Sequence, residues 1–124
     1  MLFRSTVAFS LPLLAQIDTR RFDVQALVLC PTRELADQVA TELRRLARAE
    51  DNVKILTLCG GVPIRNQLAS LEHGAHIVVG TPGRVLDHLA RESLALNALN
   101  TMVLDEADRM LDMGFADEIG RAHV

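Results

Sequence analysis

Four short apolar runs, alternating with segments of helical periodicity, constrain this sequence more than any other feature. The apolar runs, each of strand length, cover residues 25–30, 53–58, 76–80 and 101–104. The helical segments are expected at residues 6–18, 33–48, 64–72, 84–90 and 106–113. No hairpin signal joins two neighbouring runs, so the pattern predicts parallel strands connected by crossover helices. The predicted fold class is therefore α/β, with an open parallel sheet.

The helix predicted over residues 33–48 has the clearest pattern. Its apolar residues recur at helical spacing on one face, and they are Leu35, Val39, Leu43 and Leu46. Because the charged residues lie opposite, this face should pack against the sheet. The first helical segment contains Pro12. Proline lacks a backbone N–H and its ring crowds the preceding turn, so Pro12 should bend that helix or shift its start.

A polar cluster directly follows each apolar run. The four clusters are PTRE at 31–34, CGG at 59–61, TPGR at 81–84 and DEAD at 105–108. In open parallel sheets, ligands bind beyond the carboxyl ends of the strands, and these ends share one edge of the sheet. We therefore expect the four clusters to form one continuous functional surface.

The acidic cluster permits two interpretations. Asp105 and Glu106 at a strand end suit a metal–phosphate site. In such a site one carboxylate holds Mg²⁺, usually through water, and the other polarises the attacking water. The alternative is a helix start, with Asp105 as the N-cap and acidic side chains in the first turn.

The other three clusters also permit two interpretations. TPGR can bind a phosphate through backbone N–H groups and Arg84. It can equally begin a helix, with Thr81 as the cap and Pro82 as the first helical residue. PTRE allows the same two interpretations. The pair Gly60 and Gly61 lets another chain approach the backbone closely, or simply makes a turn.

Composition limits the kind of partner that the chain can bind. The 124 residues are 49% hydrophobic, with a net charge of −3 and no Trp or Tyr. This length and composition indicate a soluble globular domain, or part of one. The charge provides no broad basic field, and few aromatic side chains are present on which bases could stack. Any contact with nucleic acid must therefore be local.

The cysteines and histidines do not have the spacing of a metal site. Cys30 and Cys59 each end an apolar run, which is typical of buried thiols in a reducing cytosol. No metal is assigned to the four histidines, and His76, at a strand start, is expected to be structural. The N-terminal stretch lacks the pattern of a signal peptide, so the expected location is cytoplasmic.

Taken together, "PTRELA" (31–36), "GG" (60–61), "TPGR" (81–84) and "DEAD" (105–108) resemble the motifs of the DEAD-box RNA helicases in order and in spacing. The resemblance covers nearly the whole chain. The residues in and around these motifs are most similar to a bacterial branch of the family that acts on ribosomal RNA of the large subunit. It implies part of a RecA-like P-loop NTPase domain, with ATP and Mg²⁺ as cofactors. It also implies RNA as the partner, and ATP hydrolysis coupled to duplex unwinding in the intact protein.

The resemblance also implies roles for individual residues. Asp105 would bind Mg²⁺, Glu106 would orient the hydrolytic water, and Asp108 would link the ATP site to the other motifs. Thr6 matches the final Thr of the family's phosphate-binding loop. Single-stranded RNA would be held through its sugar–phosphate backbone, which carries little sequence information. The residues implied for this contact are Thr32, Arg33, Gly60, Gly61, Thr81, Gly83 and Arg84.

One departure from the family pattern precedes Thr6. The family has a GxGKT loop at this point, whereas this chain has "MLFRS" and therefore no loop Lys. The partial sheet would lack the P-loop strand, leaving the strand at 101–104 as a hydrophobic edge that favours aggregation. We expect the chain alone to be inactive as an ATPase. The alternatives are a weak RNA-binding piece and a non-functional reading frame.

The two ends of the chain are interpreted as foreign to the gene. One DNA sequence encoding residues 1–5, with GTG as the start codon, has a reverse complement that encodes the residues beginning at Ile119 in another frame. This DNA resembles common sequencing-adapter sequence, so residues 1–5 and 119–124 are predicted to be adapter-derived. The alternatives are coincidence and genuine but unusual termini. On the first interpretation the helicase domain covers residues 6–118.

Overall fold

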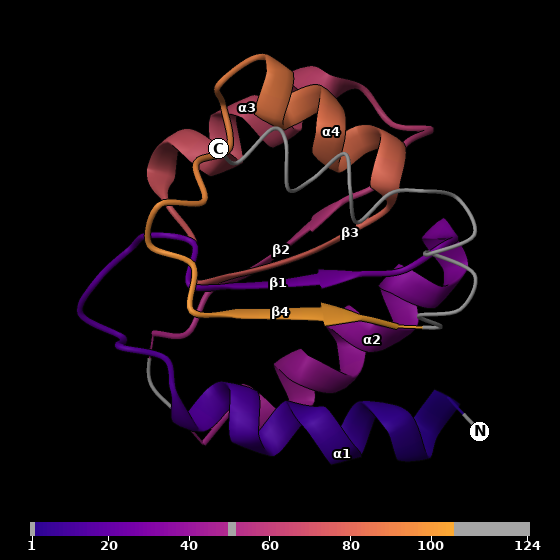
Figure 1. Ribbon diagram of the computed structural model, residues 1–124, viewed down its shortest axis with the longest axis vertical. Helices are drawn as coiled ribbons and strands as arrows, with labels where there is room; N and C mark the ends of the chain where they lie inside the picture. The colour runs from indigo at the N-terminus through magenta and orange to yellow at the C-terminus, as the bar shows by residue number, and fades with distance from the viewer. Residues whose placement is uncertain (1, 50–51, 106–124) are drawn as a thin grey trace.

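The computed structural model describes residues 2–49 and 52–105. Helices and strands alternate along the chain (Figure 1). The elements are α1 (Leu2–Ala15), β1 (Ala26–Leu29), α2 (Arg33–Ala47), β2 (Ile55–Leu58), α3 (Ile64–His73), β3 (Ile77–Gly80), α4 (Pro82–Ala90) and β4 (Thr101–Leu104). The four strands are parallel and their order in the sheet is β2-β3-β1-β4. The predicted α/β class with a parallel sheet is confirmed.

Both faces of the sheet are covered, which explains why its strands are apolar along their whole length. Helices α1 and α2 lie over one face, and α3 and α4 lie over the other (Figure 1). Alternate residues of β1 serve the two sides: Val28 packs in the cluster beneath α1 and α2, whereas Leu27 packs in the cluster with Val85 of α4. All four residues of β1 and of β3 are buried. These two strands are the centre of the core.

The boundaries of two helices differ from the prediction. Helix α4 begins at Pro82 rather than at residue 84, with Thr81 as its N-cap. The fixed φ of proline suits the first helical position, where the missing N–H costs no hydrogen bond. Helix α1 begins at Leu2 and continues through Pro12, so Pro12 does not set its start. Leu13 and Leu14 are buried in the core beside α2, and this packing offsets the hydrogen bond lost at Pro12.

Strand β4 occupies one end of the sheet formed by the described residues. Its burial is lower than that of β1, and Met102 is 42% exposed. Among residues 2–49 and 52–105, no strand pairs with the outer side of β4, in line with the edge expected for the strand at 101–104. None of the helices in the described ranges is long and apolar enough to cross a membrane.

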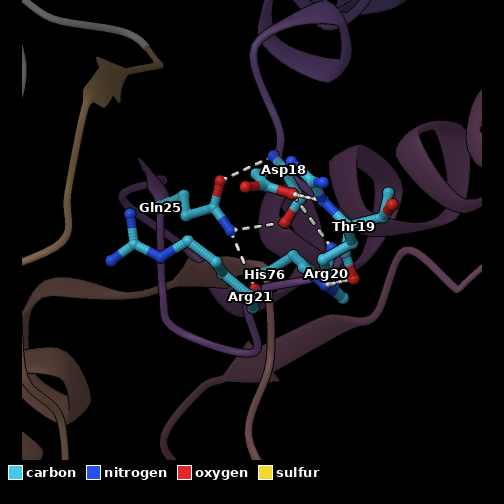
Figure 2. A network of polar contacts seen from close by, with 6 residues as sticks. All are labelled: Asp18, Thr19, Arg20, Arg21, Gln25 and His76. Atoms are coloured by element: carbon cyan, nitrogen blue, oxygen red, sulfur yellow. Dashed lines mark hydrogen bonds and ion pairs between the residues drawn. The ribbon is translucent and has the colours of Figure 1, made fainter.

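The connection from α1 to β1 is held by a polar network at the amino-terminal edge of the sheet (Figure 2). Gln25 Nε2 donates to the carbonyl oxygens of Asp18 and Arg21, each at 2.9 Å. Gln25 Oε1 accepts from the Asp18 backbone N–H at 2.8 Å. A single amide thus closes the loop on itself, and this is why a glutamine is buried at the start of β1.

His76 joins the same loop to the neighbouring strand (Figure 2). The buried ring accepts the Lys54 backbone N–H at Nδ1 (2.9 Å), and its Nε2 lies 3.1 Å from the Thr19 carbonyl oxygen. An imidazole in this setting carries its proton on Nε2 and donates it to Thr19. The ring also contacts Phe22, at a centroid separation of 4.6 Å. His76 therefore has the structural role expected for it.

Gly74, which ends α3, provides a test of this edge. Its φ of 95° and ψ of 155° belong to a region that is almost exclusive to glycine, and a Cβ there would lie 2.8 Å from the Phe22 carbonyl oxygen. Gly74→Ala should lower the free energy of unfolding by about 1–3 kcal/mol in urea titrations. Gly83→Ala is the control, because a Cβ at Gly83 meets nothing within 4 Å. Equal stability of the two variants would contradict the described contact.

Candidate functional site

The carboxyl ends of all four strands lie at one edge, as the parallel pairing requires. Across this edge the order is the Gly60–Gly61 turn after β2, residues 81–84 after β3, residues 31–34 after β1, and Asp105 after β4. Neighbouring strands are about 4.8 Å apart, so three steps separate the turn from Asp105 by about 14 Å. The three clusters that can bind phosphate, at residues 60–61, 81–84 and 31–34, are therefore neighbours along the edge. Asp105 lies at the far end of the row.

The cluster at 31–34 begins helix α2. Thr32 is the N-cap, and its Oγ1 accepts the Leu35 backbone N–H at 3.2 Å. Arg33 follows in the first turn, half exposed, with Nε 3.9 Å from Asp37 Oδ2. Exposed ion pairs of this kind contribute little to stability, so Arg33 can exchange its partner at small cost. Residues 31–34 therefore begin a helix and still leave Arg33 able to bind a phosphate. The two interpretations of this cluster do not exclude each other.

Gly61 brings the second cluster against the first. Its φ is +86°, and a Cβ at this position would lie 3.2 Å from Arg33 Nη1. A Cβ at Gly60 would meet nothing within 4 Å. The two glycines therefore expose a stretch of backbone with the Arg33 guanidinium beside it, an arrangement suited to a close-approaching anion.

Arg84 brings the third cluster to the same turn. Its Nη1 donates to the Val62 carbonyl oxygen at 3.0 Å and to Gln67 Oε1 at 3.1 Å. The sequence indicates Arg84 only as a phosphate ligand, whereas the structure also gives it a contact that secures the turn. Nε and Nη2 of the same guanidinium carry three further N–H groups suited to an anion.

Two buried polar residues beneath this edge were not singled out from the sequence. Gln67 of α3 is 7% exposed, and His88 of α4 is fully buried. His88 Nε2 lies 2.8 Å from Gln67 Oε1, and His88 Nδ1 lies 2.8 Å from Ser93 Oγ. The available signal was position: His88 lies three residues after the buried Val85, on the face of α4 that packs inward.

The surroundings of this edge shift two pKa values. Burial lowers the pKa of His88, and the nearby Arg84 guanidinium lowers it further. Gln67 Oε1 accepts from Arg84, which can only donate, so the neutral His88 ring donates to the same oxygen from Nε2. Burial raises the pKa of the Cys59 thiol, with Asp37 adding to the effect. Cys59 and Cys30 are both buried, which accords with their expected role in the core.

A polar pocket of about 330 Å³ opens beside the Gly60–Gly61 turn, between α2 and α3. Its lining includes Arg33, Asp37 and Gln67. The recess therefore continues the polar surface of the edge outward past strand β2.

The acidic cluster is described only at its first residue. Asp105 is 8% exposed, and its backbone N–H donates to the Leu29 carbonyl oxygen at 2.9 Å, continuing the pairing of β4 with β1. Glu106 and Asp108 lie outside the described residues, and Thr6 falls within α1. Within residues 2–49 and 52–105, no group of three or more His, Cys, Asp or Glu side chains is placed to hold a metal ion.

The buried His88 should make stability depend on pH. Its pKa is lowered in the folded chain, so below about pH 6.5 the unfolded chain binds more protons at this residue. The contribution of neutral His88 is complete above that pH and declines as the pH falls. Urea unfolding should show that the free energy of unfolding falls more between pH 7.5 and pH 5.5 in the parent than in His88→Gln, because glutamine does not titrate. Equal losses in the two proteins would contradict this account.

Comparisons with known proteins agree with the motif pattern. The family model described as "DEAD/DEAH box helicase" matches residues 6–123. The chain is 68% identical to the ATP-dependent RNA helicase DbpA of Escherichia coli over 114 residues, which are 92% of this chain and 25% of that protein. It is 51% identical to the ATP-dependent RNA helicase CshA of Listeria monocytogenes, again over 92% of this chain and 22% of the relative. The chain thus spans about a quarter of the length of these relatives.

Solved structures give the same result for the fold. A DEAD box protein from Methanococcus jannaschii superposes with a TM-score of 0.83 at 43% identity, covering 94% of this chain and 31% of that chain. The yeast DEAD-box splicing factor Prp28 gives a TM-score of 0.82 at 34% identity, covering 94% and 29%. The described sheet is therefore part of the RecA-like domain of such proteins. Because the family model matches residues 6–123, nearly the whole chain, this chain belongs to the DEAD/DEAH box helicase family.

Proposed function

We propose that the chain is the central part of the ATPase domain of a DEAD-box RNA helicase that couples ATP hydrolysis to RNA unwinding. One observation carries this proposal: Arg33, the Gly60–Gly61 turn and Arg84 meet at one sheet edge, in the same row as Asp105. The cation-rich end suits a phosphodiester backbone, and the acidic end suits a metal-bound nucleotide.

On the RNA side, the ligand is the sugar–phosphate backbone of a single strand. Helices α2 and α4 both begin at this edge, and the N-terminus of a helix favours an anion. The proposed contacts are Thr32, Arg33, Gly60, Gly61, Thr81, Gly83 and Arg84. Since backbone contacts carry little sequence information, this surface should bind RNA with low sequence preference.

On the nucleotide side, the proposed cofactors are ATP and Mg²⁺. A single buried carboxylate at a strand end fits Mg²⁺, which keeps several waters and takes one or two carboxylates together with substrate phosphates. Asp105 would hold the ion through water, Glu106 would orient the attacking water, and Asp108 would connect this site to the RNA-binding motifs. Thr6 would contribute to nucleotide binding. When bound, the ion neutralises charge that develops on the transferred phosphoryl group.

The substrate class is proposed to be ribosomal RNA, in assembly of the large subunit, and the location cytoplasmic. The support is the sequence in and around the motifs, which resembles that of the branch of the family acting on that RNA. The 68% identity to one bacterial RNA helicase over most of the chain is in keeping with this assignment.

RNA binding can be tested on the 124-residue chain. A labelled single-stranded oligonucleotide should shift in gels at low salt and lose the shift as salt rises, because phosphate contacts release counterions. Arg33→Ala combined with Arg84→Ala should abolish the shift. The control is Arg20→Ala combined with Arg21→Ala, which removes equal charge from exposed residues of the α1–β1 connection. No shift by the parent at low salt would reject RNA binding.

ATP turnover provides the second test. The chain has no Lys in its first five residues to reach the phosphates, and this stretch replaces the loop that holds the triphosphate in the family. We expect no RNA-stimulated phosphate release above a Glu106→Gln control. Release above that control would show that the chain is an active ATPase by itself.

A further inference from the structure

The Gly60–Gly61 turn is secured at both ends by side chains from two different helices. Gln67 Nε2 of α3 donates to the Cys59 carbonyl oxygen at 3.0 Å, directly before the glycine pair. Arg84 Nη1 of α4 donates to the Val62 carbonyl oxygen at 3.0 Å, directly after it. The carbonyl groups of the residues before and after the glycine pair are therefore both held by hydrogen bonds.

Gln67 is the centre of this arrangement. Its Oε1 accepts from Arg84 Nη1 at 3.1 Å and from His88 Nε2 at 2.8 Å, while its Nε2 serves Cys59. Rotating the amide by 180° would set an NH₂ group against two donors and a carbonyl oxygen against another carbonyl. The three partners thus allow one orientation of the amide. Because the group is buried, losing one partner would leave a polar atom unsatisfied, at a cost of about 1–3 kcal/mol.

The need for such a device follows from the glycines. A Gly-Gly segment loses more conformational entropy on ordering than any other dipeptide, and Gly61 must reach a positive φ. If the turn were mobile, a bound phosphate would have to order it, and affinity would fall by that cost. Fixing the carbonyls on either side orders the backbone N–H groups of the turn before a ligand arrives.

We propose that Gln67 is a positioning residue for RNA binding, which presents the Gly60–Gly61 backbone and the Arg84 guanidinium in one fixed geometry. Gln67 itself does not contact the RNA. This inference rests on the proposed function for its RNA ligand. The ordering of the turn does not depend on that ligand and can be measured separately.

The experiment compares Gln67→Met with the parent 124-residue chain. Methionine has nearly the volume of glutamine and fills the buried site, but it forms none of the three hydrogen bonds. The control is Asn66→Ala, which removes a neighbouring amide that is exposed on the same helix. Two quantities are measured: the affinity for a single-stranded RNA oligonucleotide, and the hydrogen-exchange rates of the Gly60, Gly61 and Val62 amides.

Gln67→Met should bind the oligonucleotide about five- to tenfold more weakly, the loss expected for about one hydrogen bond. The three turn amides should exchange faster, while amides of β1 and β3 keep their protection. A purely structural role would leave the RNA affinity of the folded variant unchanged, and that result would overturn the proposal. Unchanged exchange at the turn would overturn it as well.

Gln67→Glu covers the case in which the methionine variant does not fold. A carboxylate retains acceptors for Arg84 and His88 but cannot donate to the Cys59 carbonyl. Faster exchange at Gly60 and Gly61 in this variant supports the proposal, and parental exchange rates overturn it. If the parent binds no RNA at low salt, the proposed function fails. Exchange at the turn then still decides whether Gln67 orders it.

Discussion

The parallel pairing of β1 with β3 on one side and β4 on the other is the constraint on which the rest of the structure depends. In this register Leu29 lies opposite Gly80 and opposite Leu104, so the segments that follow these three residues leave the sheet at one level. Both faces of β1 are buried, and a slip of one residue would exchange the side chains that pack beneath α1 and α2 with those that pack on the α3 and α4 side. Core packing therefore determines where the functional residues stand.

Beneath the carboxyl edge, packing alone does not position the polar side chains. Gln67, Arg84 and His88 form a connected set of hydrogen bonds that reaches from α3 to α4 and to the backbone after β2. Buried networks of this kind rigidify a structure when every member is satisfied. The amino-terminal edge has a network of its own around Gln25 and His76 (Figure 2), which closes the α1–β1 connection. The sheet is thus held by polar contacts at both ends and by apolar contacts between them.

The order of the strands separates the two activities proposed for the edge. The glycine turn and residues 81–84 lie on the β2–β3 side, and Asp105 lies at the β4 end. Residues 31–34 follow the intervening strand β1, and their Arg33 guanidinium lies beside the turn. In a family that couples nucleotide hydrolysis to RNA binding, β1 is thus the shared neighbour of both ends. A displacement of β1 would therefore move the proposed RNA contacts and Asp105 together.

Much of this arrangement was determined by the sequence alone. Apolar runs of strand length, alternating with helical periodicity, determine parallel strands, and the clusters that follow each run must then share an edge. Local chemistry likewise placed Thr32 and Thr81 at helix starts, although α4 begins two residues earlier than expected. Only the tertiary structure decided the strand order, because chain order does not specify which strands are neighbours. It alone brought Gln67 to Cys59, 8 positions away along the β2–α3 connection, and Arg84 to Val62, 22 positions away beyond α3 and β3. For the same reason His88, one polar residue on an inward helix face, acquired Gln67 as a partner only when α3 and α4 packed together.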